Sequence, residues 1–277
     1  MTGTGTDGAL KTFSRDNRTL NEGTIREEVH FVQVFRTAAR FAFENTIFMK
    51  NNVTILILCG GKGERLRPLT ESIPKPLVLL KGRPILSYLL DHVCKFGPTE
   101  VIIAAGFKAD QIRLFFQKTH RDMNVTIVEA GDVDILARIT ACSTLIKGDF
   151  ILLYGDTLAD VNLDQLQDFH FSHSEKATIT LYPLTTQFGL AELDEHGSVT
   201  SFREKPTLDQ WINIGNFYFE REVLSWMEDF STFSEFLEFI GRQKKLKGYK
   251  HFGIHITVNT LRELEDAEVN IDEFAAT

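Results

Sequence analysis

A glycine-rich loop followed by two basic residues is the part of this sequence best suited to phosphate chemistry. The run LCGGKGERLRPLTESIPKPL contains Gly60, Gly61 and Gly63, which let the backbone turn sharply and present bare N–H groups. Arg65 supplies a planar phosphate donor, and Lys75 stands between two prolines that restrict the backbone. The spacing fits neither G-x-x-x-x-G-K-[ST] nor G-x-G-x-x-G. The loop predicts a nucleoside triphosphate site; the alternative is an ordinary turn with surface basic residues.

A second candidate is the carboxylate of Asp156. It follows the apolar run at 150–154 in the order Tyr154, Gly155, Asp156. At the end of a buried strand, a hard oxygen ligand can hold Mg²⁺ against a triphosphate. The competing interpretation is an aspartate that only begins a turn or caps a helix.

These residues need a sheet to position them, and the apolar runs predict one. Leu58 ends an uninterrupted apolar run bounded by glycines, which is typical of a strand covered on both faces. We predict that Leu58 contacts the nucleotide together with Gly60, Gly61, Gly63, Arg65 and Lys75. Strands alternate with helices, which predicts a doubly wound, Rossmann-like α/β fold with a mixed, mostly parallel sheet. The predicted strands are 53–58, 101–105, 125–128 and 150–154, and the predicted helices are 85–96 and 109–119.

The C-terminal half predicts a small β section. It could form the side of the binding cleft that receives a second substrate, the acceptor. Its expected strands are 177–181, 190–193, 198–204 and 212–219. Residues 222–247 are expected to be helical and 252–258 to form the last strand. His170 and His173 are three residues apart on a helix-like segment with no evident carboxylate companion, which favours a solvated face over a metal site.

Composition excludes several classes. The 277 residues are 43% hydrophobic and carry a net charge of −8, which argues against a nucleic-acid surface. The three cysteines have no metal-ligand spacing. We find no signal peptide and no apolar run of about 18 residues, so we expect a soluble, cytoplasmic protein without a membrane span.

The first 48 residues differ from the rest. Residues 1–23 show no periodicity and predict a tail, whereas 25–48 carry an apolar stripe typical of an amphipathic helix. This helix could dock on its own domain, on another subunit or on a membrane surface. We favour another subunit and therefore a homo-oligomer, with residues 49–277 forming the domain that carries the glycine loop.

The glycine-loop block resembles the signature of nucleotidyltransferases that make activated sugars, L-x-G-G-x-G-T-R-L-x-P-L-T ending in P-K-P. Cys59 and Glu64 depart from that signature but leave the glycines and basic residues in place. Further segments resemble glucose-1-phosphate cytidylyltransferases, and the likeness covers about residues 53 to 270. These segments are YGD followed by ADV, Phe188-Gly189, FREKP at 202–206, INIG at 212–215 and NTLR at 259–262.

The resemblance implies roles for residues outside the loop. Lys205, beside Glu204, would bind the phosphate of the sugar phosphate, although a lysine in such a turn is often only solvated. Asn213 and Gly215 would approach the sugar hydroxyls. Arg138 would remain from a T-G-G-R nucleoside-binding element that reads ILAR here. Asp132 and Asp134 near that element are better interpreted as surface turn residues.

One departure concerns the metal. The family has a second metal-binding aspartate before Thr-Leu-Arg, where this chain has Asn259. An amide oxygen can coordinate Mg²⁺ but adds no charge, so we expect weaker metal binding by Asp156 and Asn259.

The predicted reaction joins a nucleoside triphosphate and a sugar 1-phosphate into an NDP-sugar and pyrophosphate. The resemblance favours CTP and glucose 1-phosphate, and the predicted catalytic residues are Arg65, Lys75 and Asp156. Within the class, another base or another phosphorylated acceptor remains open, since the RLRPLTESIPKP run also resembles mannose-1-phosphate guanylyltransferases. A non-catalytic, nucleotide-sugar-binding regulator is the alternative from a different class.

Overall fold

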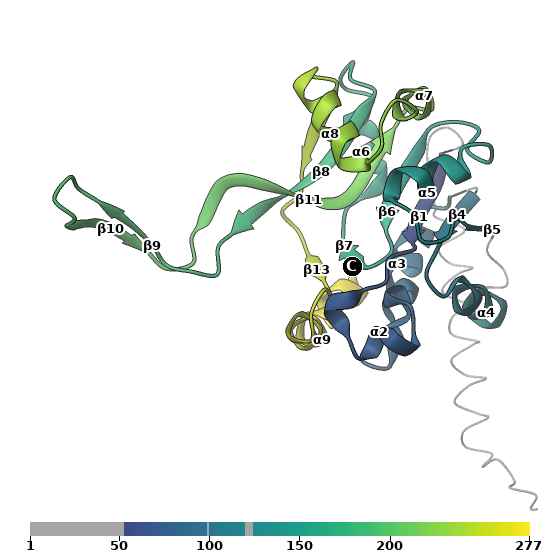
Figure 1. The fold of residues 1–277 in the computed structure, drawn as a ribbon, viewed down its shortest axis with the longest axis horizontal. Coiled ribbons are helices and arrows are strands. Elements are labelled where there is room, and N and C mark those ends of the chain that lie inside the picture. Colours follow the sequence, from purple (N-terminus) through teal and green to yellow (C-terminus); the bar gives the residue numbers. More distant parts are fainter. Residues whose placement is uncertain (1–52, 99, 120–123) are drawn as a thin grey trace, which may run out of the picture. The chain divides into compact units, whose positions relative to one another are not determined.

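The computed structural model describes residues 53–98, 100–119 and 124–277 (Figure 1). The predicted tail and amphipathic helix, residues 1–48, lie outside the described residues. Nowhere in the described ranges is a helix both long and apolar enough to cross a membrane.

A seven-stranded sheet organises the domain, in the order β12-β8-β11-β6-β1-β4-β5. Strands β1, β4, β5 and β6 run parallel, β11 is antiparallel to both β6 and β8, and β12 is parallel to β8. The predicted mixed, mostly parallel sheet is therefore confirmed. The strands are β1 (Thr54–Cys59), β4 (Glu100–Ala105), β5 (Val125–Glu129), β6 (Phe150–Tyr154), β8 (Ala177–Thr185), β11 (Thr207–Phe219) and β12 (Leu246–Lys250).

Both faces of the sheet are covered, as the uninterrupted apolar strands require. Alternate residues of β1 enter different cores: Ile55 and Ile57 pack in one, and Leu56 and Leu58 pack in the other. The first core includes residues of α3 (Ile85–Cys94), α4 (Ala109–Thr119), α6 (Leu163–His170) and α9 (Leu261–Ala276). The second includes residues of α5 (Ile135–Cys142), α7 (Val223–Met227) and α8 (Phe233–Arg242). The fold is doubly wound.

Short elements complete the domain near the ends of the strands. They are η1 (Glu64–Leu66), α2 (Leu69–Ser72), η2 (Lys75–Leu77), β2 (Leu79–Leu80), β3 (Arg83–Pro84), β7 (Thr157–Ala159) and β13 (His255–Thr257).

The expectation of one helical stretch over 222–247 was wrong. α7 ends at Met227, and α8 begins after Thr232, whose hydroxyl accepts from Glu235 N while the Glu235 carboxylate accepts from Thr232 N. This capping box starts a new helix. The chain then enters β12, which pairs with β8 and supplies the edge strand. The last predicted strand, 252–258, shortens to β13.

The β section predicted at 190–204 forms a separate arm. Strands β9 (Leu190–Leu193) and β10 (Val199–Arg203) pair only with each other and project away from the main sheet (Figure 1). Phe188, Leu193, Val199 and Phe202 are each more than 60% exposed on this arm. Because a two-stranded hairpin has no core of its own, these apolar side chains lie in solvent.

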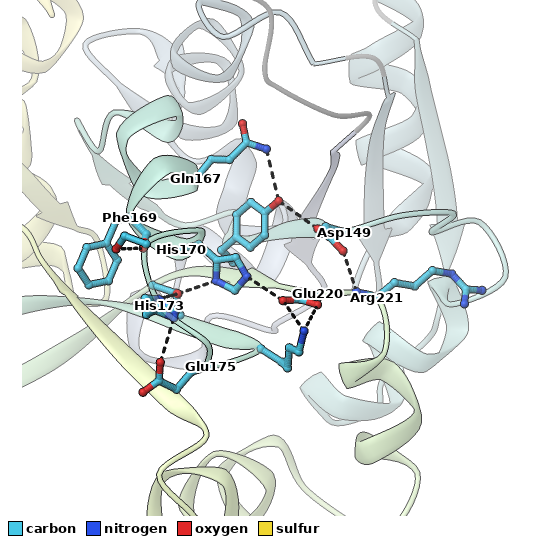
Figure 2. A network of polar contacts seen from close by, with 12 residues as sticks. Asp149, Gln167, Phe169, His170, His173, Glu175, Glu220 and Arg221 are labelled. Atoms are coloured by element: carbon cyan, nitrogen blue, oxygen red, sulfur yellow. Dashed lines mark hydrogen bonds and ion pairs between the residues drawn. The ribbon is translucent and has the colours of Figure 1, made fainter.

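His170 and His173 are not on a solvated face, contrary to expectation. His170 is 1% exposed and stacks on Tyr218, with Nδ1 2.8 Å from Thr178 Oγ1. Carboxylates are also close, because Glu220 lies 3.7 Å from His170 and Glu175 lies 3.1 Å from His173 (Figure 2). Glu220 follows β11, which is distant in sequence, whereas Glu175 is only two residues after His173 in the turn that follows α6 and could have been noticed in the sequence. Even so, no group of three or more metal-ligating side chains occurs in the described residues.

Candidate functional site

The glycine loop leaves the carboxyl end of β1 with an open backbone. Gly63 has φ 63°, a left-handed conformation that a side chain would strain, and its carbonyl accepts from Thr70 Oγ1 at 2.8 Å. A Cβ added at Gly61 would meet nothing within 4 Å. The Gly61 backbone therefore faces free space, where a phosphate could approach its N–H.

Gly60 is also constrained by its neighbours, because protein atoms already fill the space where a side chain would lie. A Cβ there would lie 2.2 Å from Cζ of Arg138, and one at Gly106 would lie 2.8 Å from the Gly60 Cα. Gly60 is thus required for close packing of the loop against Arg138 and Gly106.

The Arg138 guanidinium is buried against this loop. Its Nη2 donates to Val133 O at 2.8 Å, while its Nε has no hydrogen-bond partner and burial lowers the pKa of the group. The structure brings Arg138 to the predicted nucleotide loop with one donor unused. Asp134 caps α5 by accepting from Leu136 N, and Asp132 pairs with Lys62 at 2.5 Å, both in agreement with the interpretation as turn residues.

Lys75 is the centre of the polar cluster at the strand ends. Pro74 and Pro76 flank it, its side chain is 9% exposed, and its ammonium lies in reach of two oxygens. Nζ donates to Asp156 Oδ2 at 2.5 Å and to Asn259 Oδ1 at 2.8 Å. Three segments that are distant in sequence therefore meet at one ammonium group.

Arg65 joins the cluster through the same amide. Arg65 Nη2 donates to Asn259 Oδ1 at 3.1 Å, so one neutral oxygen accepts from two cations. Asn259 N donates to Glu263 Oε2 at 2.6 Å, which fixes the backbone ahead of α9. With Arg65 and Lys75 positive and Asp156 negative, the four side chains have a surplus of one positive charge. That balance suits a polyanionic ligand.

The oxygen donors of this cluster fit Mg²⁺ only in part. Asp156 is a carboxylate with a side chain 33% exposed, so one hard ligand is accessible. The Asn259 oxygen already accepts from two cations and would bind a metal only if they moved to a ligand's phosphates. A metal here would draw its remaining ligands from phosphates and water.

Cys59 offers no alternative chemistry. Burial raises the pKa of its thiol, with a further contribution from the nearby Asp156 carboxylate. The thiolate that a nucleophile requires is disfavoured.

Asn213 and Gly215 lie against Tyr154, next to the cluster. Gly215 has φ 77°, and a Cβ there would lie 2.4 Å from the Tyr154 ring. The Asn213 side chain accepts from Gly215 N at 2.8 Å. The two residues shape this edge of the site, and Ile214 between them packs in the core.

Glu204 and Lys205 are not brought to the Lys75 cluster. They occupy the exposed connection between β10 and β11, where Lys205 has φ 43° and Glu204 lies near Gly189. In the described residues no hydrogen bond or ion pair joins either side chain to Lys75, Asp156 or Asn259. Their predicted contact with a sugar phosphate stays a prediction.

Two supporting residues had not been singled out from the sequence. Thr70 holds the loop through Gly63, and Glu263 holds the backbone of Asn259. A signal exists for Glu263, because Thr260 and Glu263 have the spacing of a helix start, and Thr260 Oγ1 accepts from Glu263 N.

Comparison with known proteins agrees with this architecture. The model of the Nucleotidyl transferase family matches residues 54–243, more than half of the chain. The chain is 30% identical over 236 residues to a glucose-1-phosphate cytidylyltransferase of Salmonella typhi, covering 75% of this chain and 91% of that protein. It is 31% identical over 188 residues to a Drosophila melanogaster mannose-1-phosphate guanylyltransferase catalytic subunit beta. That match covers 64% of this chain and 51% of the relative.

A solved structure of UDP-glucose pyrophosphorylase complexed with UDP-glucose has the same fold, with a TM-score of 0.63. The match covers 80% of this chain and 98% of that one at 13% identity, so it speaks for the fold alone. Fold, family match and relatives agree: the chain belongs to the Nucleotidyl transferase family, and its relatives there include the glucose-1-phosphate cytidylyltransferases that its motifs resemble.

Proposed function

We propose that this protein transfers a nucleotidyl group from a nucleoside triphosphate to a sugar 1-phosphate, releasing pyrophosphate. The observation that carries the proposal is the convergence of Arg65, Lys75 and Asp156 beside an open glycine loop at the carboxyl ends of β1 and β6. Ligands of open α/β sheets bind at that edge.

The proposed reaction needs no protein nucleophile. An oxygen of the acceptor phosphate attacks the α-phosphorus and forms a new P–O bond, while the bond between the α-phosphorus and its bridging oxygen breaks. Pyrophosphate leaves with that electron pair. Catalysis would come from orientation and from charge stabilisation.

Named residues have distinct tasks in this proposal. Arg65 and the Gly61 N–H would hold the β- and γ-phosphates, and Lys75 would stabilise charge at the α-phosphate. When bound, Mg²⁺ supplies further charge neutralisation, with Asp156 as the residue that would hold it. For these contacts to form, the Lys75 ammonium would turn from the Asp156 carboxylate toward the phosphate.

The favoured substrates are CTP and glucose 1-phosphate. Support comes from the cytidylyltransferase motifs and from the relative of that name, which aligns over most of both chains. The guanylyltransferase relative keeps another base and another sugar in consideration. Asn259, in place of a charged ligand, is the observation that favours the regulatory alternative.

A pyrophosphate-release assay tests the proposal. Each of four nucleoside triphosphates is combined with glucose 1-phosphate, mannose 1-phosphate and other phosphorylated acceptors at saturating Mg²⁺. We expect release only when both substrates are present, with a pyrimidine triphosphate preferred. Nucleotide-sugar binding without turnover for any pair would instead identify a regulator.

A homo-oligomer is part of the proposal. The arm exposes four large apolar side chains, which a contact with another subunit would bury. Another copy of the chain would cover them. Light scattering should give a mass above the 31.5 kDa of one chain, and a monomer would contradict the idea.

A further inference from the structure

Two aromatic rings and one ammonium group form an exposed cluster that the reaction above does not use. Phe252 is 70% exposed, and its ring lies edge-on to Trp211 with 5.6 Å between centroids. Lys250 Nζ lies 4.6 Å from the centroid of the Trp211 ring. No ion pair engages Lys250 in the ranges that the structure describes. We call Trp211, Lys250 and Phe252 the aromatic platform.

The sheet places this platform at its ligand-binding edge. Strand β11 runs antiparallel to β6, so its first half, with Trp211 and Asn213, lies beyond the carboxyl end of β6, where Asp156 follows. β12 is parallel to β8 and antiparallel in direction to β11, so Lys250 and Phe252 come to the same edge.

Register defines which side chains share a face. Leu181 of β8 pairs with Asn213 on one side and with Lys250 on the other. Paired residues point to the same face, and Trp211 is two residues from Asn213 on an uninterrupted stretch of ladder. Trp211, Asn213 and Lys250 therefore face the same side of the sheet.

The spacing of strands fits a sugar attached to the reacting phosphate. Neighbouring strands are about 4.8 Å apart, so the Trp211 end of β11 is roughly one strand from the end of β6. A pyranose ring is of similar width. A phosphate reacting near Asp156 would place its sugar over β11 and β8.

We infer that the aromatic platform is the subsite for the sugar of the acceptor. The apolar face of the pyranose would lie on Trp211 and Phe252, which offer flat carbon surface. Lys250 would donate hydrogen bonds to hydroxyl oxygens at the end of the sugar remote from the phosphate. This inference rests on the proposed function and assigns sugar recognition to residues other than Glu204 and Lys205.

Only two tryptophans occur in the chain, which provides a direct probe. Trp226 lies on α7 in the second core, so Trp226→Phe leaves Trp211 as the sole reporter. CDP-glucose, or the product identified by the pyrophosphate assay, should change the fluorescence of Trp226→Phe saturably. CDP should not, because it lacks the sugar. Trp211→Phe, which retains only Trp226, is the matched control and should stay silent with both ligands.

Kinetics gives the second readout. Lys250→Met should raise the KM for the sugar 1-phosphate about tenfold, as expected for loss of one charge-assisted hydrogen bond. The KM for the nucleoside triphosphate should stay unchanged. Lys247→Met is the control, since Lys247 is on the same strand but pairs with Glu175 at 3.8 Å.

Each outcome separates this inference from the proposed function. The subsite alone would be overturned if the wild-type protein turns over its substrates, the fluorescence of Trp211 does not respond to the nucleotide sugar, and Lys250→Met has an unchanged KM for the sugar 1-phosphate. A smaller mass of Phe252→Ala by light scattering, with unchanged acceptor KM, would assign the platform to a subunit contact and also overturn it. Absence of turnover for every substrate pair would instead contradict the proposed function.

Discussion

Two polar clusters lie at opposite ends of strand β6, and they differ in what surrounds them. At the carboxyl end, Lys75, Asp156 and Asn259 sit beside an open loop with a surplus of positive charge. At the amino end, Asp149 accepts from Arg221 N, and Glu220 lies beside His170 (Figure 2). His170 also stacks on Tyr218 and contacts Thr178, so its ring is enclosed.

The contrast shows that residue type alone does not identify a site. The histidine cluster contains the residues most often associated with catalysis, but packing between α6, β8 and β11 closes it. The Lys75 cluster contains a lysine and an amide, and it lies at the strand ends beside the exposed backbone of Gly61. Three predictions test this division between a binding cluster and a structural one.

The largest effect is expected for Lys75→Ala. Removing a donor that stabilises charge at the reacting phosphate should lower kcat about 10²- to 10³-fold, equivalent to roughly 3–4 kcal/mol. Water can hydrate the Asp156 carboxylate once Lys75 is removed. The free energy of unfolding should therefore fall by less than the activation free energy rises. Steady-state kinetics and thermal unfolding measure both quantities. Lys81→Ala, which removes an exposed ion pair with Asp272, is the control, and near-normal turnover of Lys75→Ala would refute its role.

The second effect concerns stability in acid. Burial lowers the pKa of His170 to about 4 from its ordinary 6.5. Nearby His173 and Lys176 oppose protonation of His170 more than Glu220 favours it. Burial also lowers the pKa of His173. The unfolded chain therefore takes up a proton at higher pH than the folded chain. Stability present above pH 6.5 should be lost as pH falls toward 4, by about 3 kcal/mol for this residue.

The variant that isolates this contribution is His170→Gln. Its unfolding free energy should depend less steeply on pH between 6.5 and 4 in urea titrations, while turnover at pH 7 persists because the cluster is remote from the binding edge. His196→Gln alters an exposed ring in the turn of the arm and is the control. An unchanged slope in His170→Gln would show that other groups carry the acid sensitivity.

The smallest effect is expected for Asn259→Asp. A carboxylate in place of the amide adds negative charge beside Asp156, which should lower the Mg²⁺ concentration for half-maximal rate about tenfold, or roughly 1.4 kcal/mol. Mg²⁺ titrations of both proteins measure it. Asn270→Asp, which makes the same change on the exposed side of α9, should leave the requirement unaltered. If Asn259→Asp does the same, the amide acts as an acceptor for Arg65 and Lys75 and not as a metal ligand.

The sequence by itself determined three central strands of the sheet and the candidate phosphate loop. Uninterrupted apolar runs can be stable only with both faces covered, so β1, β4 and β6 were predictable within one residue at each end. The spacing of Gly60 to Lys75 likewise indicated a phosphate site. A strand or a loop can be predicted in this way because the residues that specify it are neighbours in the sequence.

Tertiary structure alone decided how distant segments combine. The contact of Lys75 with both Asp156 and Asn259 joins residues 81 and 184 positions away, which no local pattern encodes. Close packing against Arg138 also requires a glycine at position 60, and the sequence spacing does not reveal that contact. The arm leaves Glu204 outside the cluster, and pairing of β12 with β8 ended a stretch expected to be helical. These outcomes depend on which surfaces meet, and that is fixed by packing across the whole domain.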